Sequence, residues 1–408
     1  MNAKRNMDAR ERKIVGVVGA AHFFSHFYFL VLPLMFPILY DVYGIGYTEL
    51  GIGYAVFSGA TLICQTPIGF IVDRYGARLI LIAGVAVESF VLVLFGVFHT
   101  YFAYLILMGI AGIANAVYHP CDYSILTRSV NKSSLGKAFS IHTFCGQMGS
   151  ASAPVVIVLI TLGVEWNHAL MLCGVLGLVL VLCLFIGFRS VDIPSITDSQ
   201  PVTDNRKSSI RLLLSPSILL GWLFFLGYAM SSTGLYDFSV SAFTEIYASP
   251  LAHAGVVIWL FLLADAIGIL SAGFFAHRWV RHDLVVTHCF IGVAACMFFI
   301  TFVPMPLWAL TIPMVIAGLF YGFIAPSRDV IISQLAPAKD MGKVFGTVTT
   351  GFNAGGIIGP PLFGFLLDLG DPYSIFWGAG VIALLSIATV VTPAALRRHG
   401  TAVASQRK

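Results

Sequence analysis

Residues 136–154 read GKAFSIHTFCGQMGSASAP, and residues 342–360 read GKVFGTVTTGFNAGGIIGP. The two stretches align without a gap at an offset of 206 positions, and each runs from a Gly-Lys-x-Phe opening through a glycine-rich segment to a proline. A second match pairs three residues with three others: Gly69, Phe70 and Arg74 with Gly273, Phe274 and Arg278. The chain therefore consists of two related halves. A repeat of this size is typical of secondary transporters, in which the substrate site lies between the halves.

The composition indicates that the solvent of this protein is a lipid bilayer. Hydrophobic residues make up 58% of the chain, charged residues only 10%, and the mean hydropathy is +0.90. Apolar runs of about 20 residues or more predict membrane spans, and we expect twelve, near 14–40, 47–72, 77–98, 101–127, 135–162, 168–188, 213–244, 252–276, 284–303, 307–335, 342–368 and 373–393. The predicted fold is an all-α membrane protein with twelve transmembrane helices in two six-helix, pseudo-symmetric halves.

Charge patterning predicts the domain organisation and the orientation. We expect halves at 1–188 and 213–396, a cytoplasmic linker at 189–212 and a cytoplasmic tail at 397–408. Lys and Arg near span ends are retained on the cytoplasmic side, and with both termini inside, all 23 Lys and Arg except Arg328 fall in cytoplasmic segments. The predicted location is therefore the plasma membrane, a bacterial inner membrane, and the net charge of +4 gives no reason to expect nucleic acid as a partner.

The sequence contains no pattern that indicates catalysis or a bound cofactor. It has neither a GxxxxGKS/T phosphate loop nor a nucleophile spaced for activation by a base. The seven cysteines form no CxxC pair, so neither a disulfide framework nor a zinc site is indicated. We expect no enzyme, no cofactor and no metal. About 26 apolar residues follow the basic N-terminus, too many for a signal-peptide core, so the first span is expected to remain.

The turn between the second and third spans, residues 69–78, reads GFIVDRYGAR. It resembles the signature cytoplasmic loop of the major facilitator superfamily, and the twelve spans and the repeat extend this resemblance across essentially the whole chain. The resemblance implies that Asp73 approaches the positive N-terminal end of the eleventh helix, near Met341, and thereby holds an outward-facing state. The residues of this predicted latch are Gly69, Asp73, Arg74, Gly76 and Arg78. The alternative is an ordinary charged turn that aids membrane insertion.

The corresponding turn of the second half departs from the pattern. It keeps Gly273, Arg278 and Arg281 but has His277 in place of Asp73. A latch in the second half is therefore expected to be weaker or absent.

Small residues follow one face of the fifth and eleventh spans, which predicts close contact between helices. The residues expected to pack in this way are Gly146, Gly149, Pro154, Gly355, Gly359 and Pro360. Both stretches resemble the glycine-proline motif that the superfamily's antiporters carry on the fifth helix, although here the eleventh span preserves it better. Packing alone is the alternative reading.

Few ionisable residues lie inside the spans, where each is costly unless it faces a cavity or a partner. On the fourth span, Asn115, His119 and Asp122 are four and three positions apart and are expected to share one face. On the tenth span, Tyr321 and Arg328 are spaced likewise, and the repeat superposes Asp122 on Arg328. An acid in one half and a base in the other would suit a site between the halves.

We hypothesise that Arg328 holds an anionic group of the substrate, because its planar guanidinium can donate two parallel hydrogen bonds. Asp122 would be the protonatable carboxylate, with His119 adjusting or relaying the proton. The alternative is that Arg328 forms a structural or gating ion pair with Asp329 or Asp122.

Histidines on the first span offer a second polar group. His22 and His26 are four positions apart and face one side, and His142 of the fifth span is expected at a similar depth. Three interpretations of the pair stay open: polar lining of a cavity, proton coupling, and metal binding, for which no clear carboxylate or thiol completes the ligand shell.

The remaining polar residues complete the predicted sites. Asp265 is a reserve proton site, Glu88 lies on the more peripheral third span, and Asp237 and Glu245 are expected to be solvated near the outer end of the seventh. The predicted substrate contacts are Arg328, Tyr321, Asn115, His26, Tyr28 and Tyr236. The predicted proton-coupling residues are Asp122, His119, Asp265 and His22.

A narrower resemblance is to the fosmidomycin-resistance group of the superfamily. It rests on His22 with Pro37 fifteen residues later, on Tyr118-His119-Pro120 and on the stretch from Gly149 to Pro154. The group has acidic residues where this chain has His26 and Cys121, and the acid here moves to Asp122.

These observations together predict a proton-coupled secondary active transporter that moves a small organic anion or an amphiphilic drug-like compound by alternating access. The alternatives are a proton-antiport drug efflux pump and a non-transporting membrane receptor or metal-binding protein. The expected partners are a small-molecule substrate, protons and the lipid bilayer, and the family resemblance implies a monomer.

Overall fold

The computed structural model describes residues 7–189, 215–275, 281–333 and 341–406, and within these ranges it contains helices and no β-strand. The helices of the first half are α1 (Ala9–Leu34), α2 (Phe36–Tyr43), α3 (Tyr47–Tyr75), α4 (Ala77–Phe95), α5 (Tyr101–Asn115), α6 (Tyr118–Ser129), α7 (Lys132–Thr161) and α8 (Trp166–Arg189). The helices of the second half are α10 (Pro216–Tyr247), α11 (Leu251–Phe275), α12 (His282–Phe302), the 3-10 helix η2 (Leu307–Leu310), α13 (Thr311–Ser333), α14 (Met341–Asp368) and α15 (Ser374–Gln406).

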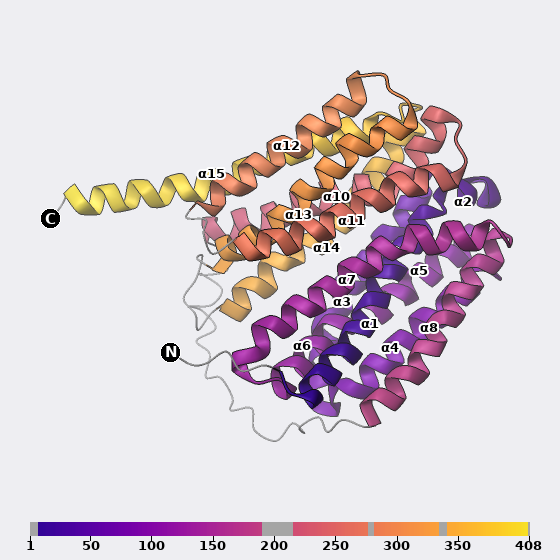
Figure 1. The fold of residues 1–408 in the computed structure, drawn as a ribbon, viewed down its shortest axis with the longest axis horizontal. Coiled ribbons are helices and arrows are strands. Elements are labelled where there is room, and N and C mark those ends of the chain that lie inside the picture. Colours follow the sequence, from indigo (N-terminus) through magenta and orange to yellow (C-terminus); the bar gives the residue numbers. More distant parts are fainter. Residues whose placement is uncertain (1–6, 190–214, 276–280, 334–340, 407–408) are drawn as a thin grey trace. The chain divides into compact units, whose positions relative to one another are not determined.

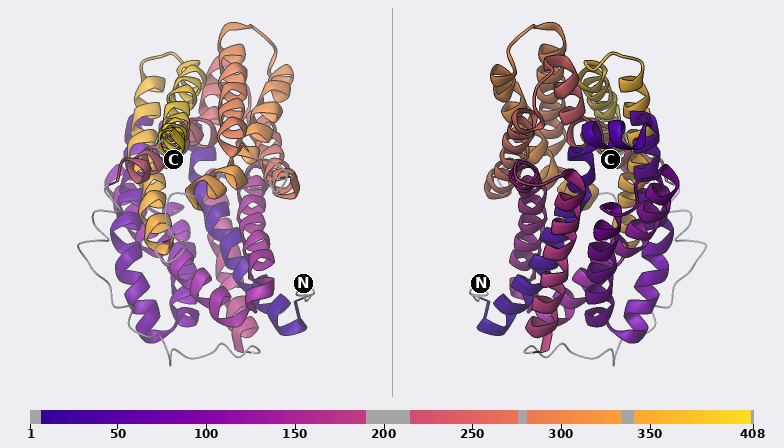
Figure 2. Two further views of the ribbon diagram at one scale, coloured as in Figure 1. Left: turned by 90° about the vertical axis from the view of Figure 1, so that its left-hand side faces the viewer. Right: turned by 90° about the vertical axis from the view of Figure 1, so that its right-hand side faces the viewer.

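The helices account for the predicted spans. In the described part of the chain, ten helical segments are long and apolar enough to cross a membrane, and Ser374–Val390 of α15 is a shorter apolar helix. Helix α14 coincides with the predicted eleventh span. The chain divides into two compact units, Met1–Gln200 and Pro201–Lys408, called the N-unit and the C-unit below. Figures 1 and 2 show that each consists of long helices packed lengthwise.

Two predicted segments differ in the structure or lie outside the described residues. The predicted linker at 189–212 is outside them apart from Arg189, and so are His277 and Arg278 of the second-half turn. Helix α15 continues to Gln406 and therefore runs through most of the predicted tail at 397–408.

Two of the spans are broken into consecutive helices, and a proline explains each break. Proline has no N–H, and its ring clashes with the carbonyl four residues earlier. Pro37 thus cannot bond the carbonyl of Pro33, and α1 ends at Leu34 before α2 begins. Pro120 likewise leaves the carbonyl of Ala116 without its helical partner, and α5 ends at Asn115.

The same helix pairs are in contact within each unit. In the N-unit α1 packs on α7, α3 on α5, and α4 on α8; in the C-unit the equivalent pairs are α10 with α14, α11 with α13, and α12 with α15. The repeat in the sequence is thus a repeat in helix packing.

Candidate functional site

Close packing of α1 on α7 positions a polar cluster inside the N-unit. A Cβ atom added to Gly149 would lie 2.0 Å from the carbonyl oxygen of Phe23, so only glycine permits this approach of the two backbones. A Cβ atom at Gly146 would lie 2.8 Å from the ring of His22 and 3.0 Å from that of His26. The glycines of α7 therefore make room for the two histidines of α1.

The centre of this cluster is a buried carboxylate between two imidazoles. The Oδ2 atom of Asp122, on α6, lies 2.9 Å from Nε2 of His142, on α7, and 3.5 Å from Nδ1 of His22. The rings of His22 and His142 are stacked, with centroids 3.7 Å apart and an angle of 19° between their planes. All three side chains are buried, Asp122 completely. We call His22, Asp122 and His142 the His–Asp triad.

The triad is not saturated with hydrogen bonds. Among the described residues, no hydrogen-bond partner reaches Oδ1 of Asp122 or Nδ1 of His22, and both atoms are buried. Buried polar atoms are nearly always hydrogen-bonded, so each unpartnered atom calls for an explanation.

Two more histidines and a tyrosine surround the triad. The ring of His26 meets that of His22 edge-on at 4.7 Å, and its Nδ1 atom lies 3.3 Å from Oγ of Ser150. His119 is exposed on the surface of the N-unit, and its ring centroid lies 5.6 Å from that of His22. Tyr123, 48% exposed, stacks on His119 and contacts His142. The triad thus lies one layer of side chains below the surface of its unit.

Asn115 does not join the cluster, contrary to the prediction that it shares a face with His119 and Asp122. The break between α5 and α6 redirects it, and its Nδ2 atom donates to Oε1 of Glu88 on α4 at 3.4 Å. The hydroxyl of Tyr118 donates to Oε2 of the same carboxylate at 2.6 Å. Glu88 is buried, so α4 carries a second polar centre. The sequence places Glu88 on a more peripheral span and predicts no role for it.

Tyr28 also lies away from the triad. Its hydroxyl lies 3.0 Å from Oγ of Ser89 and 3.3 Å from the carbonyl oxygen of Cys173, and thereby ties α1 to α4 and α8. With Glu88 it borders a cavity of about 30 Å³, which has room for water but not for an organic molecule. These hydrogen bonds and this small cavity do not support the predicted contact between Tyr28 and substrate.

In the C-unit, Asp265 on α11 is buried, and it accepts one hydrogen bond, from the hydroxyl of Tyr236 at 2.9 Å. Its other oxygen, Oδ1, has no hydrogen-bond partner among the described residues. Tyr321 is buried and makes a short hydrogen bond with Ser231, and its ring and that of Tyr236 both contact the ring of Phe261. The predicted residues Asp265, Tyr236 and Tyr321 therefore belong to one interior region.

Arg328, on α13, lies among aromatic rings. Its guanidinium carbon is 5.0 Å from the ring centroid of Phe225, 5.7 Å from that of Tyr228 and 5.3 Å from that of Phe352. Its Nε atom donates to Oδ1 of Asp329 at 2.9 Å. The predicted ion pair between Arg328 and Asp329 is therefore present in the structure.

Asp237 is buried, contrary to the expectation that it is solvated. It is 1% exposed, and neither of its carboxylate oxygens has a hydrogen-bond partner in the described part of the chain. Glu245, by contrast, is exposed as expected. Helix α10 buries the face that carries Asp237, and no periodicity in the sequence distinguished that face.

The turn of the predicted latch is built on one glycine. Gly76 is the single residue between α3 and α4, and its φ of +88° favours glycine. Asp73, with a 67% exposed side chain, accepts a hydrogen bond from Arg128 of α6 at 3.1 Å. Arg74 extends over the ring of Tyr75. Contact of Asp73 with α14 concerns the other unit and stays a prediction.

The packing glycines of the C-unit repeat those of the N-unit. Cβ atoms at Gly355 and Gly359 of α14 would lie 2.5 Å from Ala229 and 3.2 Å from Thr233 of α10. Pro154 and Pro360 are buried in the equivalent helices α7 and α14. The repeated glycine-rich stretch thus makes the same helix contact twice.

The fold defines a multi-pass, all-α membrane protein built from two related halves. The family model of the Major Facilitator Superfamily matches residues 18–312 and 229–407. The chain belongs to this superfamily, which confirms the predicted resemblance and makes the protein a membrane transporter with the major facilitator fold of twelve transmembrane helices.

Individual relatives are distant but span most of the chain. The uncharacterized MFS-type transporter YttB of Bacillus subtilis (strain 168) is 25% identical over 371 residues, 88% of this chain and 89% of its own length. The fosmidomycin resistance protein of Escherichia coli (strain K12) is 21% identical over 392 residues, 93% of this chain and 92% of its own. A crystal structure of the nucleoside transporter NupG shares the fold, with a TM-score of 0.76, 15% identity, and coverage of 94% of this chain and 99% of that one.

Proposed function

We propose that this protein is a secondary active transporter that couples the movement of a small organic anion or amphiphilic molecule to protons by alternating access. Membership of the superfamily supports transport. The observation that carries proton coupling is Asp265, a carboxylate buried in a span with one hydrogen-bond donor and one unpartnered oxygen.

The environment of Asp265 suits reversible proton binding. An ionised carboxylate in an apolar interior is costly unless donors or cations compensate it. The one described hydrogen-bond donor is Tyr236, and the positive charge of Arg328 acts on the carboxylate only through space, so a proton on Oδ1 would remove the cost of burying a charge there. Release of the proton would require a change in surroundings, such as exposure to water in another state of the transport cycle. In this proposal Asp265, which the sequence indicates as a reserve proton site, carries the proton.

For the substrate we propose the surroundings of Arg328. Three aromatic rings hold the guanidinium through cation–π contacts, which stabilise a cation where water is scarce. Its partner Asp329 is 53% exposed, so a carboxylate or phosphonate of a substrate could replace it on the guanidinium. The aromatic rings would then contact the apolar part of an amphiphilic molecule.

Reconstitution in liposomes with a trapped pH dye tests the proposal. A panel of organic acids and drug-like compounds is added outside; acidification of the lumen indicates symport, and alkalinisation indicates exchange for protons. We expect Asp265→Asn to abolish the proton signal. A full signal in Asp265→Asn combined with its loss in Asp122→Asn would refute this assignment and return the proton site to Asp122.

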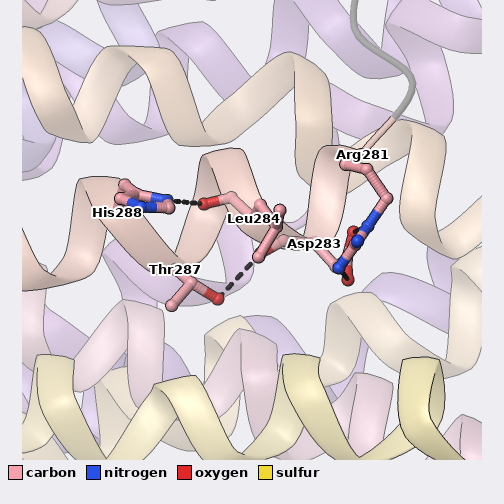
Figure 3. Close-up of polar contacts among 5 residues, drawn as sticks. All are labelled: Arg281, Asp283, Leu284, Thr287 and His288. Atoms are coloured by element: carbon pink, nitrogen blue, oxygen red, sulfur yellow. Dashed lines mark hydrogen bonds and ion pairs between the residues drawn. The ribbon is translucent and has the colours of Figure 1, made fainter.

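The Arg281–Asp283 pair at the start of α12 supplies matched controls. Arg281 donates from Nε and Nη2 to Asp283 at 2.9 and 2.8 Å, as Figure 3 shows. We expect Arg328→Gln to weaken substrate affinity at least tenfold, about 1.4 kcal/mol, while Arg281→Gln and Asp283→Asn leave affinity and proton signal unchanged. Equal affinity in Arg328→Gln and the wild type would leave Arg328 a structural role only.

The excess of basic residues in one set of predicted loops supports both termini on the cytoplasmic side of a bacterial plasma membrane. We further propose that the protein acts as a monomer and without catalysis. Saturable flux into vesicles would exclude a receptor that does not transport.

A further inference from the structure

We propose that the His–Asp triad of the N-unit binds a divalent first-row transition-metal ion of the Zn²⁺, Ni²⁺ or Co²⁺ class. His22, Asp122 and His142 each offer one ligand atom, and these atoms all lie within 4.8 Å of one another. In the described part of the chain no other group of three or more His, Cys, Asp or Glu side chains converges in this way. Two imidazoles and a carboxylate are a set that such ions prefer.

The structure identifies the carboxylate ligand that sequence spacing did not indicate. Sequence spacing alone identified no carboxylate that could join the histidine pair on α1 as a metal ligand. Packing of α6 and α7 against α1 brings Asp122 and His142 to His22. The partner of His22 in the site is therefore His142 rather than His26, which lies 3.3 Å from Oγ of Ser150.

The distances fit an ion after a small adjustment. Ligand atoms in a tetrahedral zinc site are about 3.3–3.6 Å apart, since each lies about 2.0–2.2 Å from the ion. The Asp122 carboxylate oxygen is 2.9 Å from His142 and 3.5 Å from His22. The two imidazole rings are stacked nearly parallel, so their lone pairs converge only if the rings tilt toward a common centre.

The unpartnered atoms are an independent indication of a ligand. Oδ1 of Asp122 is buried and has no hydrogen-bond partner among the described residues, and Nδ1 of His22 is buried with Oδ2 of Asp122 at 3.5 Å but no hydrogen bond of acceptable geometry. Leaving such atoms without a partner costs about 1–3 kcal/mol each. An ion at the centre of the triad would bind Nδ1 directly and either oxygen of the carboxylate.

Access and selectivity follow from the neighbouring side chains. His119 is exposed and Tyr123 is 48% exposed, and their rings contact His22 and His142. An ion could thus reach the triad by displacing one layer of side chains, and His119 could donate a fourth ligand. No cysteine of the described chain joins the group, which disfavours soft ions such as Cu⁺.

Cobalt spectroscopy on the purified full-length protein tests the proposal. The protein is isolated in detergent with a tag that contains no histidine and is titrated with Co²⁺, whose visible bands report the ligand set. We expect one equivalent to bind with a nitrogen and oxygen spectrum and to be displaced by Zn²⁺. His142→Gln and Asp122→Asn should each weaken binding at least about tenfold.

His288→Gln is the control, because His288 is exposed and its Nδ1 bonds the carbonyl of Leu284 on its own helix (Figure 3). His142→Cys keeps a ligand and should add a cobalt–thiolate transition in the near ultraviolet, a signature that a misfolded variant would not give. Three results would each overturn the proposal. The first is that the wild type binds no Co²⁺, and the second is that His142→Gln and Asp122→Asn both bind it with wild-type affinity. The third is Co²⁺ bound to His142→Cys without the thiolate transition. The proton assay, run with a chelator present, tests the transport proposal separately.

Discussion

Substitution of Gly149 by alanine should separate α1 from α7. The added Cβ atom would lie 2.0 Å from the carbonyl oxygen of Phe23, whereas ordinary contact begins at 3.4 Å. The two helices must therefore move apart by about 1.4 Å along this line, because neither a backbone carbonyl nor a helix backbone can rotate away locally. Overpacking of this kind costs about 1–3 kcal/mol.

Gly136 provides the matched control on the same helix. It is exposed, and a Cβ atom there would meet nothing within 4 Å, so Gly136→Ala should gain about 0.5–1 kcal/mol from helix propensity. The two glycine-to-alanine variants are therefore expected to differ by about 1.5–4 kcal/mol in stability. The His–Asp triad lies across the same helix contact, so Co²⁺ binding should weaken only in Gly149→Ala.

Thermal unfolding in detergent, followed by monodisperse protein remaining after heating, measures the difference. The midpoint should fall for Gly149→Ala and hold or rise for Gly136→Ala. Equal midpoints for the two variants would show that the α1–α7 contact is not as close as the structure has it, and the positions of His22 and His142 would then lose their support.

Three further predictions concern the latch turn and the interior of the N-unit. The exposed Asp73–Arg128 pair should contribute about 0–1 kcal/mol to stability, so Asp73→Asn is expected to slow flux in liposomes with little change in unfolding midpoint; an equal defect in Arg128→Gln would assign the effect to this pair instead of to α14. Gly76→Ala should destabilise by about 1–2 kcal/mol because φ is +88° there, whereas Gly69→Ala, with nothing within 4 Å, should not; thermal unfolding compares them. Tyr28→Phe should lose about 1 kcal/mol through its hydrogen bonds while the substrate affinity measured by flux stays unchanged, and a large loss of affinity would restore Tyr28 as a substrate contact.

The helix ends at the prolines show what can be predicted from local sequence and what cannot. Pro37 and Pro120 are visible in the sequence, and the missing N–H explains the ends of α1 and α5. The break after Asn115 then sends its side chain to Glu88, which the spacing rule for an unbroken helix could not anticipate. The burial of Asp237 could not be predicted for a related reason, since depth along a span does not reveal which face of the helix packs inward.

The class of the protein follows from the amino-acid sequence alone. Long apolar runs must form helices in a bilayer, because no water there satisfies exposed backbone groups, and the repeated glycine-proline stretch specified the same close helix contact in both halves. Which polar residues meet depends on how the helices pack, and sequence patterns do not give that packing. His22 lies on α1, far along the chain from Asp122 and His142 on the consecutive helices α6 and α7, and periodicity gives the face of a helix but not its neighbour. The triad exists because packing of α1, α6 and α7 brings those faces together.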